Sequence, residues 1–124
     1  MLKTLLLIGT GSFFGGILRY LLSIFIQSKN TSIFPFGTLT VNILGCFLIG
    51  LIIGYINKGN LASEWYFFLV TGLLGGFTTF SAFSIESVNL FNHNQPIYAI
   101  TYVGLSLILG LSATFLAYIA VGNN

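Results

Sequence analysis

Hydrophobic and polar positions divide the chain into four long apolar segments separated by three short polar ones. The apolar segments cover roughly residues 4–27, 37–56, 65–91 and 97–121. In a helix, about 20 apolar residues cross a bilayer core of roughly 30 Å. The pattern therefore predicts an all-α integral membrane protein with four transmembrane helices in a single domain, residues 1–124.

Composition strengthens this prediction and excludes several functions. Hydrophobic residues make up 56% of the chain and charged residues only 5%, whereas soluble domains carry about 25% charged residues. We expect a multi-pass protein of the inner or plasma membrane. The net charge of +2, without a basic cluster, argues against a nucleic-acid partner. With no soluble domain, no nucleophile–base pair and no metal-ligand spacing, we do not expect an enzyme.

The third apolar segment contains a stretch, Gly72 to Glu86, that is poorly suited to a continuous helix in lipid. Gly75 and Gly76 are adjacent, and Thr78 follows almost at once. Glycine loses the most entropy in a helix, and threonine is a middling helix former. We therefore predict that the third helix is broken near the membrane midplane, with freed carbonyl groups that face a cation.

Positive charge is spread almost evenly over the two ends of the predicted helices. Lys3 and Lys58 lie at one end, and Lys29 lies at the other. An excess of lysine and arginine on one side normally sets the orientation of a membrane protein. So weak a bias, in a chain too short to enclose its own pore, leads us to hypothesise an antiparallel homodimer with dual topology.

Helix rise places five polar or aromatic residues in one layer, on the far side of the midplane from the N-terminus. They are Arg19, Asn42, Phe80, Phe83 and Tyr102. Arg19 either anchors its helix at the interface or attracts anions, and Asn42 either joins helices or lines a pathway. The phenylalanines either pack against their surroundings or offer the positive edges of their rings to an anion.

Three motifs carry a resemblance to a known family. They are residues 15–20 (Gly-Gly-Ile-Leu-Arg-Tyr), 36–50 (from Phe-Gly-Thr-Leu-Thr-Val-Asn onward) and 75–86 (Gly-Gly-Phe-Thr-Thr-Phe-Ser-Ala-Phe-Ser-Ile-Glu). In their order and content they resemble the signatures of the CrcB/Fluc fluoride channels. The resemblance covers the whole chain, and it implies a dual-topology homodimer in the lipid bilayer, with two antiparallel fluoride pores at the subunit interface.

The same resemblance implies roles for individual residues. Phe80 and Phe83 are similar to the phenylalanines whose ring edges contact fluoride, Asn42 to the pore-lining asparagine, and Arg19 to the vestibule arginine. The implied fluoride pathway also includes Thr38, Ser81, Glu86, Tyr102 and Ser106. The backbone carbonyls of Gly75 and Thr78 resemble the ligands of a central sodium ion, which is the implied cofactor.

The chain departs from the family pattern at three positions. Ala82 stands where the family often has threonine, so one side-chain donor of the third helix is missing. Gly110 stands where a serine of the fourth helix is expected, although Ser112 is close, and Cys46 replaces a small serine.

Two other functions fit the length and the number of helices. A small dual-topology multidrug or cation exporter has a similar architecture, but it needs a carboxylate in its first helix, where this chain has Arg19. A purely structural four-helix scaffold leaves the layer around Asn42 and Phe80 unexplained. We therefore expect a fluoride-selective passive channel that exports fluoride.

Overall fold

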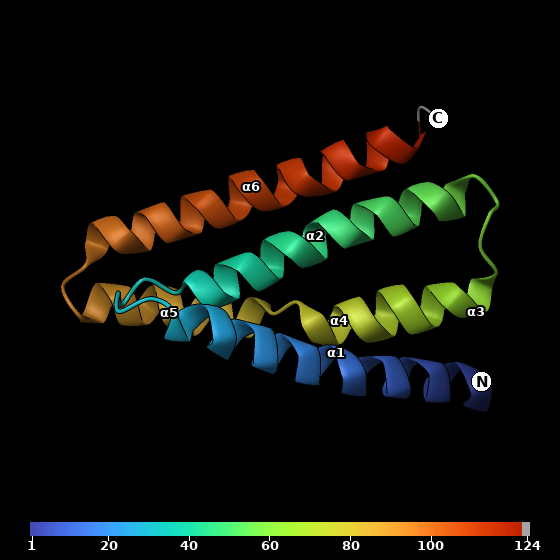
Figure 1. Ribbon diagram of the computed structural model, residues 1–124, viewed down its shortest axis with the longest axis horizontal. Coiled ribbons are helices and arrows are strands. Elements are labelled where there is room, and N and C mark those ends of the chain that lie inside the picture. The colour runs from blue at the N-terminus through green and yellow to red at the C-terminus, as the bar shows by residue number, and fades with distance from the viewer. Residues whose placement is uncertain (123–124) are drawn as a thin grey trace.

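The computed structural model describes residues 1–122 and has four helical spans long and apolar enough to cross a membrane (Figure 1). Three of them are the single helices α1 (Leu2–Ser28), α2 (Phe36–Asn57) and α6 (Pro96–Gly122). The remaining span, Ser63–Asn92, consists of several helical segments. The prediction of an all-helical chain with four long apolar helices is confirmed.

The third span changes its backbone conformation four times. The short helix α3 (Ser63–Trp65) leads into the π-helical segment η1 (Tyr66–Leu74), and α4 (Gly75–Phe77) follows. Thr78 and Thr79 are then extended, with ψ angles of 154° and 120°, before α5 (Phe80–Asn92) begins. Figure 1 shows this extended segment as the thin yellow stretch between the coiled ribbons of α4 and α5.

Thr79 explains why a new helix begins where it does. Its side-chain Oγ1 accepts a hydrogen bond of 3.1 Å from the backbone N–H of Ala82. Threonine is a favoured N-cap residue, because its side chain satisfies a donor that has no partner within the helix. The sequence from Thr79 to Ala82 therefore encodes a helix start inside a span that is apolar throughout.

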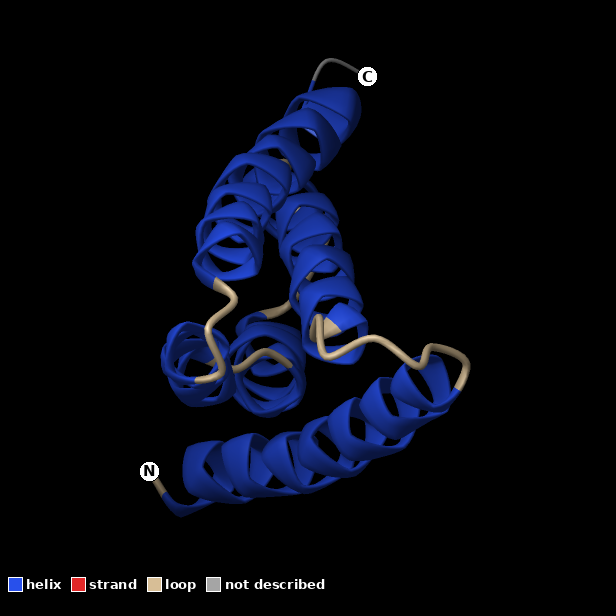
Figure 2. Cartoon of the chain, turned by 90° about the vertical axis from the view of Figure 1, so that its left-hand side faces the viewer, coloured by secondary structure: helices blue, strands red, loops and turns tan. Residues whose placement is uncertain are grey.

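The four spans alternate in direction, and α1 and α6 lie on opposite sides of the bundle in both views (Figures 1 and 2). The N-terminus and the start of the third span lie at the same end, where Lys3 Nζ contacts Glu64 Oε1 at 2.6 Å. The loops after α1 and α5 lie at the other end.

Glycines allow α1 to approach the third span very closely. A Cβ atom on Gly15 would collide with the backbone carbonyl of Leu73. A Cβ atom on Gly76 would lie only 2.6 Å from the carbonyl oxygen of Ser12. Small residues at such contacts let helix backbones come close together in lipid, where no hydrophobic effect drives helices to associate.

Buried apolar side chains form two clusters at different heights of the bundle. The first joins α2, α5 and α6 near the loop after α1 and contains Phe34, Leu90 and Tyr102. The second consists of Val41, Leu74 and Phe77, and it packs α2 against the last turns before the extended segment. The buried side chain of Phe77 therefore directly precedes the extended segment and fixes the position of Thr78.

Candidate functional site

Asn42 of α2 is paired with the extended segment through both ends of its amide. Its Nδ2 donates to the carbonyl oxygen of Thr79 at 3.0 Å, and the backbone N–H of Thr79 donates to its Oδ1 at 2.8 Å. Within lipid, backbone groups outside a helix need partners in the protein. Asn42 supplies those partners and holds the extended segment against α2.

This pairing and the Thr79 cap together release two backbone carbonyl groups. In a continuous α-helix, the N–H of residue i donates to the carbonyl of residue i−4. In such a helix, the carbonyls of Gly75 and Thr78 would accept hydrogen bonds from the N–H groups of Thr79 and Ala82. Here those two N–H groups donate instead to the side chains of Asn42 and Thr79, respectively. The two carbonyls predicted as cation ligands therefore lose their helical donors.

Arg19 of α1 approaches the same segment. Its Nε donates to the carbonyl oxygen of Gly76 at 3.2 Å, and the side chain is half-buried. The guanidinium therefore satisfies a third carbonyl near the end of α4. This contact ties α1 to the extended segment and gives the half-buried charge a partner, as a charge at membrane depth requires.

A groove of about 360 Å³ lies beside the extended segment. Its lining combines four of the predicted fluoride-pathway residues with the two predicted sodium ligands: Asn42, Phe80, Phe83, Ser106, Gly75 and Thr78. The rings of Phe80 and Phe83 are tilted by 47°, with centroids 5.4 Å apart. Phe80 is 77% exposed, so one wall of the groove is bare in the single chain.

A second polar cluster continues from the groove toward the loop after α1. The ring of Phe83 lies 5.3 Å from the ring of Tyr102, centroid to centroid. The hydroxyl of Tyr102 donates to Glu86 Oε2 at 2.8 Å, and the hydroxyl of Thr38 donates to Glu86 Oε1 at 2.8 Å. One carboxyl group thus joins α2, α5 and α6 by accepting hydrogen bonds from two hydroxyl groups.

The predicted site residues are therefore distributed over three neighbouring places. Asn42, Phe80, Phe83, Ser106, Gly75 and Thr78 line the groove. Thr38 and Tyr102 lie in the cluster around Glu86, and Arg19 contacts Gly76 from α1. Ser81 lies at the start of α5, where its Oγ is 3.2 Å from Oγ1 of Thr79.

The roles of Thr79 and Gly76 were not among those predicted from the sequence. Thr79 pairs with Asn42 and caps α5, and the carbonyl of Gly76 is the acceptor for Arg19. The preference of threonine for N-cap positions was the available signal for Thr79. No signal in the sequence indicates the acceptor for Arg19, because that contact joins positions 57 residues apart.

Two departures from the family pattern lie next to each other in space. A Cβ atom on Gly110 would be 3.4 Å from Sγ of Cys46, which lines the groove. A larger residue at Gly110 would therefore press on the cysteine, and the two departures form one packing contact between α2 and α6.

The chemistry of a cation site here would come from the backbone. Among residues 1–122, no group of three or more His, Cys, Asp or Glu side chains has the arrangement of a metal site. The carbonyl oxygens of Gly75 and Thr78 suit a hard cation such as sodium, because such ions bind oxygen ligands.

Comparison with known proteins gives a consistent result. Residues 6–118 match the family model described as CrcB-like protein, Camphor Resistance. The chain is 47% identical to a fluoride-specific ion channel FluC of Flavobacterium psychrophilum, over 92% of this chain and 93% of that protein. It is 40% identical to a protein of the same name from Azobacteroides pseudotrichonymphae, over 96% of each. The corresponding protein of Agrobacterium fabrum is 42% identical, over 95% of this chain and 94% of that protein.

Proposed function

The chain belongs to the CrcB-like family, and from that premise we propose that it is a passive, fluoride-selective ion channel. Its four membrane-spanning helices make it a multi-pass protein of the cell membrane. The observation that carries the proposal is the groove in which the Asn42 amide and the rings of Phe80 and Phe83 line one space.

The groove offers an anion weak and well-spaced partners. The Nδ2 group of Asn42 has two hydrogens, and its bond to Thr79 uses one of them. The second hydrogen remains for an anion, together with the hydroxyl of Ser106 and the positive ring edges of Phe80 and Phe83. Such donors replace part of the hydration shell of a small anion without holding it too tightly, which conduction requires.

The cluster around Glu86 forms the next stage of the proposed pathway. Thr38 and Tyr102 donate to its carboxylate. A fluoride ion that reaches Tyr102 would compete with this carboxylate for the hydroxyl hydrogen. Arg19 lies at the level of Gly76 and adds positive potential near the centre of the pathway.

We propose that two copies assemble as an antiparallel homodimer with two pores at their interface. The exposed Phe80 ring and the bare wall of the groove support this, because a polar pathway cannot open directly onto lipid. The nearly even distribution of Lys3, Lys58 and Lys29 over the two ends supports insertion in both orientations.

We further propose a sodium ion at the centre of this dimer. The freed carbonyls of Gly75 and Thr78 would hold it, and the corresponding carbonyls of the second copy would complete the set. The bound ion would supply positive charge beside the two pathways and brace the extended segments of both copies.

A passive fluoride channel and a proton-coupled cation exporter differ in the ions that they carry across the membrane. We would load liposomes containing the purified protein with potassium fluoride and follow fluoride outside with an electrode. A channel releases fluoride only after valinomycin gives potassium a parallel path, and it needs no pH gradient. No release of fluoride from folded protein, even with valinomycin, would favour the proton-coupled cation exporter instead. Helix α1 contains no aspartate or glutamate to carry the exchanged proton.

A further inference from the structure

A second groove, of about 620 Å³, lies between α1, α2 and the third span. All nine of its lining side chains are leucine or phenylalanine, among them Leu18 and Phe25 of α1 and Leu48 of α2. It opens on the α1 side of the bundle, whereas the first groove involves Ser106 of α6. Nothing in it favours an ion, so its occupant is apolar.

The groove lies within one leaflet of a bilayer. Phe25 lies in the last turn of α1, and Leu18 lies seven residues deeper, which corresponds to about 10 Å along the helix axis. From Lys29, just beyond α1, to Leu18 the distance is about 16 Å. Half of a typical hydrocarbon core is about 15 Å. The groove therefore begins about one helical turn below Lys29 and ends near the level where the leaflets meet.

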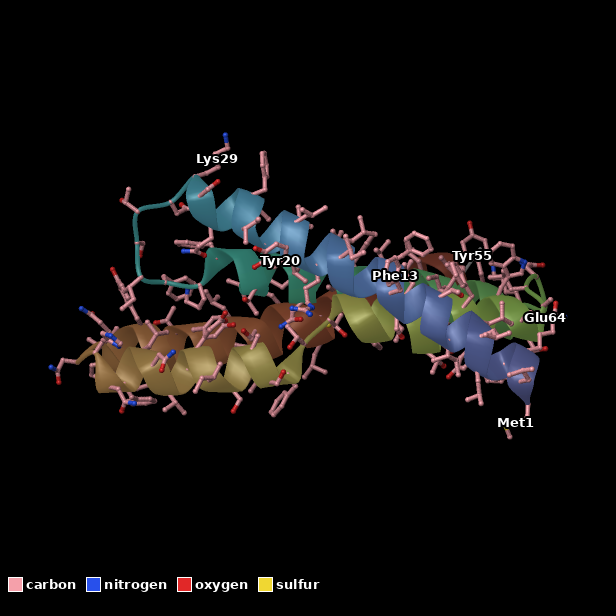
Figure 3. The ribbon with its side chains drawn as sticks, turned by 90° about the horizontal axis from the view of Figure 1, so that it is seen from below. Met1, Phe13, Tyr20, Lys29, Tyr55 and Glu64 are labelled. Carbon is pink, nitrogen blue, oxygen red and sulfur yellow. The ribbon has the colours of Figure 1, made fainter. Side chains whose placement is uncertain are left out.

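A positive charge stands at the outer end of this groove. Lys29 Nζ lies 5.1 Å from the ring centroid of Phe25, a residue that lines the groove. Lys29 is exposed (Figure 3). The two acidic residues of the chain are engaged elsewhere, since Glu64 pairs with Lys3 and Glu86 accepts from Thr38 and Tyr102. Among residues 1–122, Lys29 therefore has no carboxylate partner.

From this charge complementarity we propose that the groove binds an anionic phospholipid. One acyl chain would lie along the leucine and phenylalanine side chains, and the headgroup phosphate would pair with Lys29. A lysine near the surface of an anionic membrane contributes about 1 kcal/mol, which corresponds to about a fivefold preference over a zwitterionic lipid. The proposal concerns the α1 side of the bundle and does not depend on which ion the protein conducts.

The test uses tryptophan fluorescence quenched by lipids that carry bromine on their acyl chains. Trp65 would be replaced by phenylalanine, because it is the only tryptophan of the chain. A reporter would then be introduced by Leu21→Trp, at a half-exposed position that lines the groove. The matched control reporter is Leu111→Trp, on the exposed surface of α6. Each protein would be measured in vesicles with brominated phosphatidylglycerol or brominated phosphatidylcholine in an unbrominated background.

At the groove, we expect the relative affinity for phosphatidylglycerol to exceed that for phosphatidylcholine about fivefold. Lys29→Gln should abolish this preference, whereas Lys58→Gln, which removes an exposed lysine at the other end, should leave it unchanged. The control reporter on α6 should show no preference.

Equal affinities at the groove would overturn the proposal, as would a preference that survives Lys29→Gln. A reporter that neither lipid quenches would also overturn it, because protein, such as a second copy of the chain, would then cover the groove.

Discussion

At the scale of single residues, Asn42 has two tasks, which use different atoms of one amide. Its amide holds the extended segment through Thr79, and its remaining hydrogen is offered to the groove. Phe80 is different, because its ring is largely exposed and contributes little to the packing of one chain. The two residues therefore allow structural and functional effects to be separated.

Replacing Asn42 by alanine should destabilise the protein. It leaves the N–H and carbonyl of Thr79 without their partner, and unpaired buried polar groups cost about 1–3 kcal/mol each. Unfolding of the purified protein in mixed detergent micelles measures this loss. Asn89→Ala is the matched control, because Asn89 lies exposed on α5. Equal midpoints for the two variants would contradict the pairing of Asn42 with Thr79.

Phe80→Ile should leave the fold intact and reduce fluoride flux. Isoleucine fills similar space but has no positive ring edge, and a loss of ~1.4 kcal/mol at the barrier slows permeation about tenfold. Flux from liposomes gives the rate, and the unfolding midpoint verifies the fold. Phe91→Ile, at an exposed ring on the same helix, should conduct normally. Wild-type flux from the Phe80 variant would reject a role for its ring edge.

At the scale of elements, the third span is the informative one. Its apolar character predicted where the span lies in the sequence. The extended residues Thr78 and Thr79 lie inside the stretch from Gly72 to Glu86, which the sequence indicated as poorly suited to a continuous helix. The π-helical turns of η1 could not be predicted, because no local propensity in the sequence distinguishes them from α-helical turns.

The candidate site was predictable to a similar degree. Helix rise placed Arg19, Asn42 and Phe83 at similar depths, and the structure has them at successive contacts around the extended segment. Which partner each one chooses was not predictable. The acceptors for Arg19 and Asn42 are backbone carbonyls of the third span, and their availability depends on where that span leaves the helical conformation.

The close approach of α1 to the third span can be tested with a pair of adjacent glycines. Gly15→Ala should destabilise the protein by about 1–3 kcal/mol, because its Cβ would collide with the carbonyl of Leu73. Gly16→Ala should be neutral or stabilise by up to ~1 kcal/mol, since its Cβ would meet nothing within 4 Å. The same unfolding assay compares them, and a reversed order would show that α1 packs through another face.

At the scale of the whole molecule, a single chain leaves the groove beside the extended segment with one bare wall. Two oppositely oriented copies would cover this groove in each other. Such an assembly would require no charge bias within the chain. The lysines at the two ends are compatible with such an arrangement.

Dual orientation predicts how copies label in intact cells. In a Cys46→Ser background, Thr31→Cys and Asn60→Cys report the two ends of the bundle and keep every lysine in place. An impermeant maleimide should label about half of the copies of each variant. Complete labelling of one variant and none of the other would mean a single orientation and would contradict the antiparallel dimer.

The measurement that tests the central claim most directly is ion selectivity of the unmodified protein. Liposomes loaded with equal fluoride and chloride would be supplied with valinomycin, and electrodes for both anions would follow their release. We predict that fluoride leaves rapidly and that chloride is retained as in protein-free vesicles. Release of chloride at a comparable rate, or no release of fluoride from verified folded protein, would contradict the account.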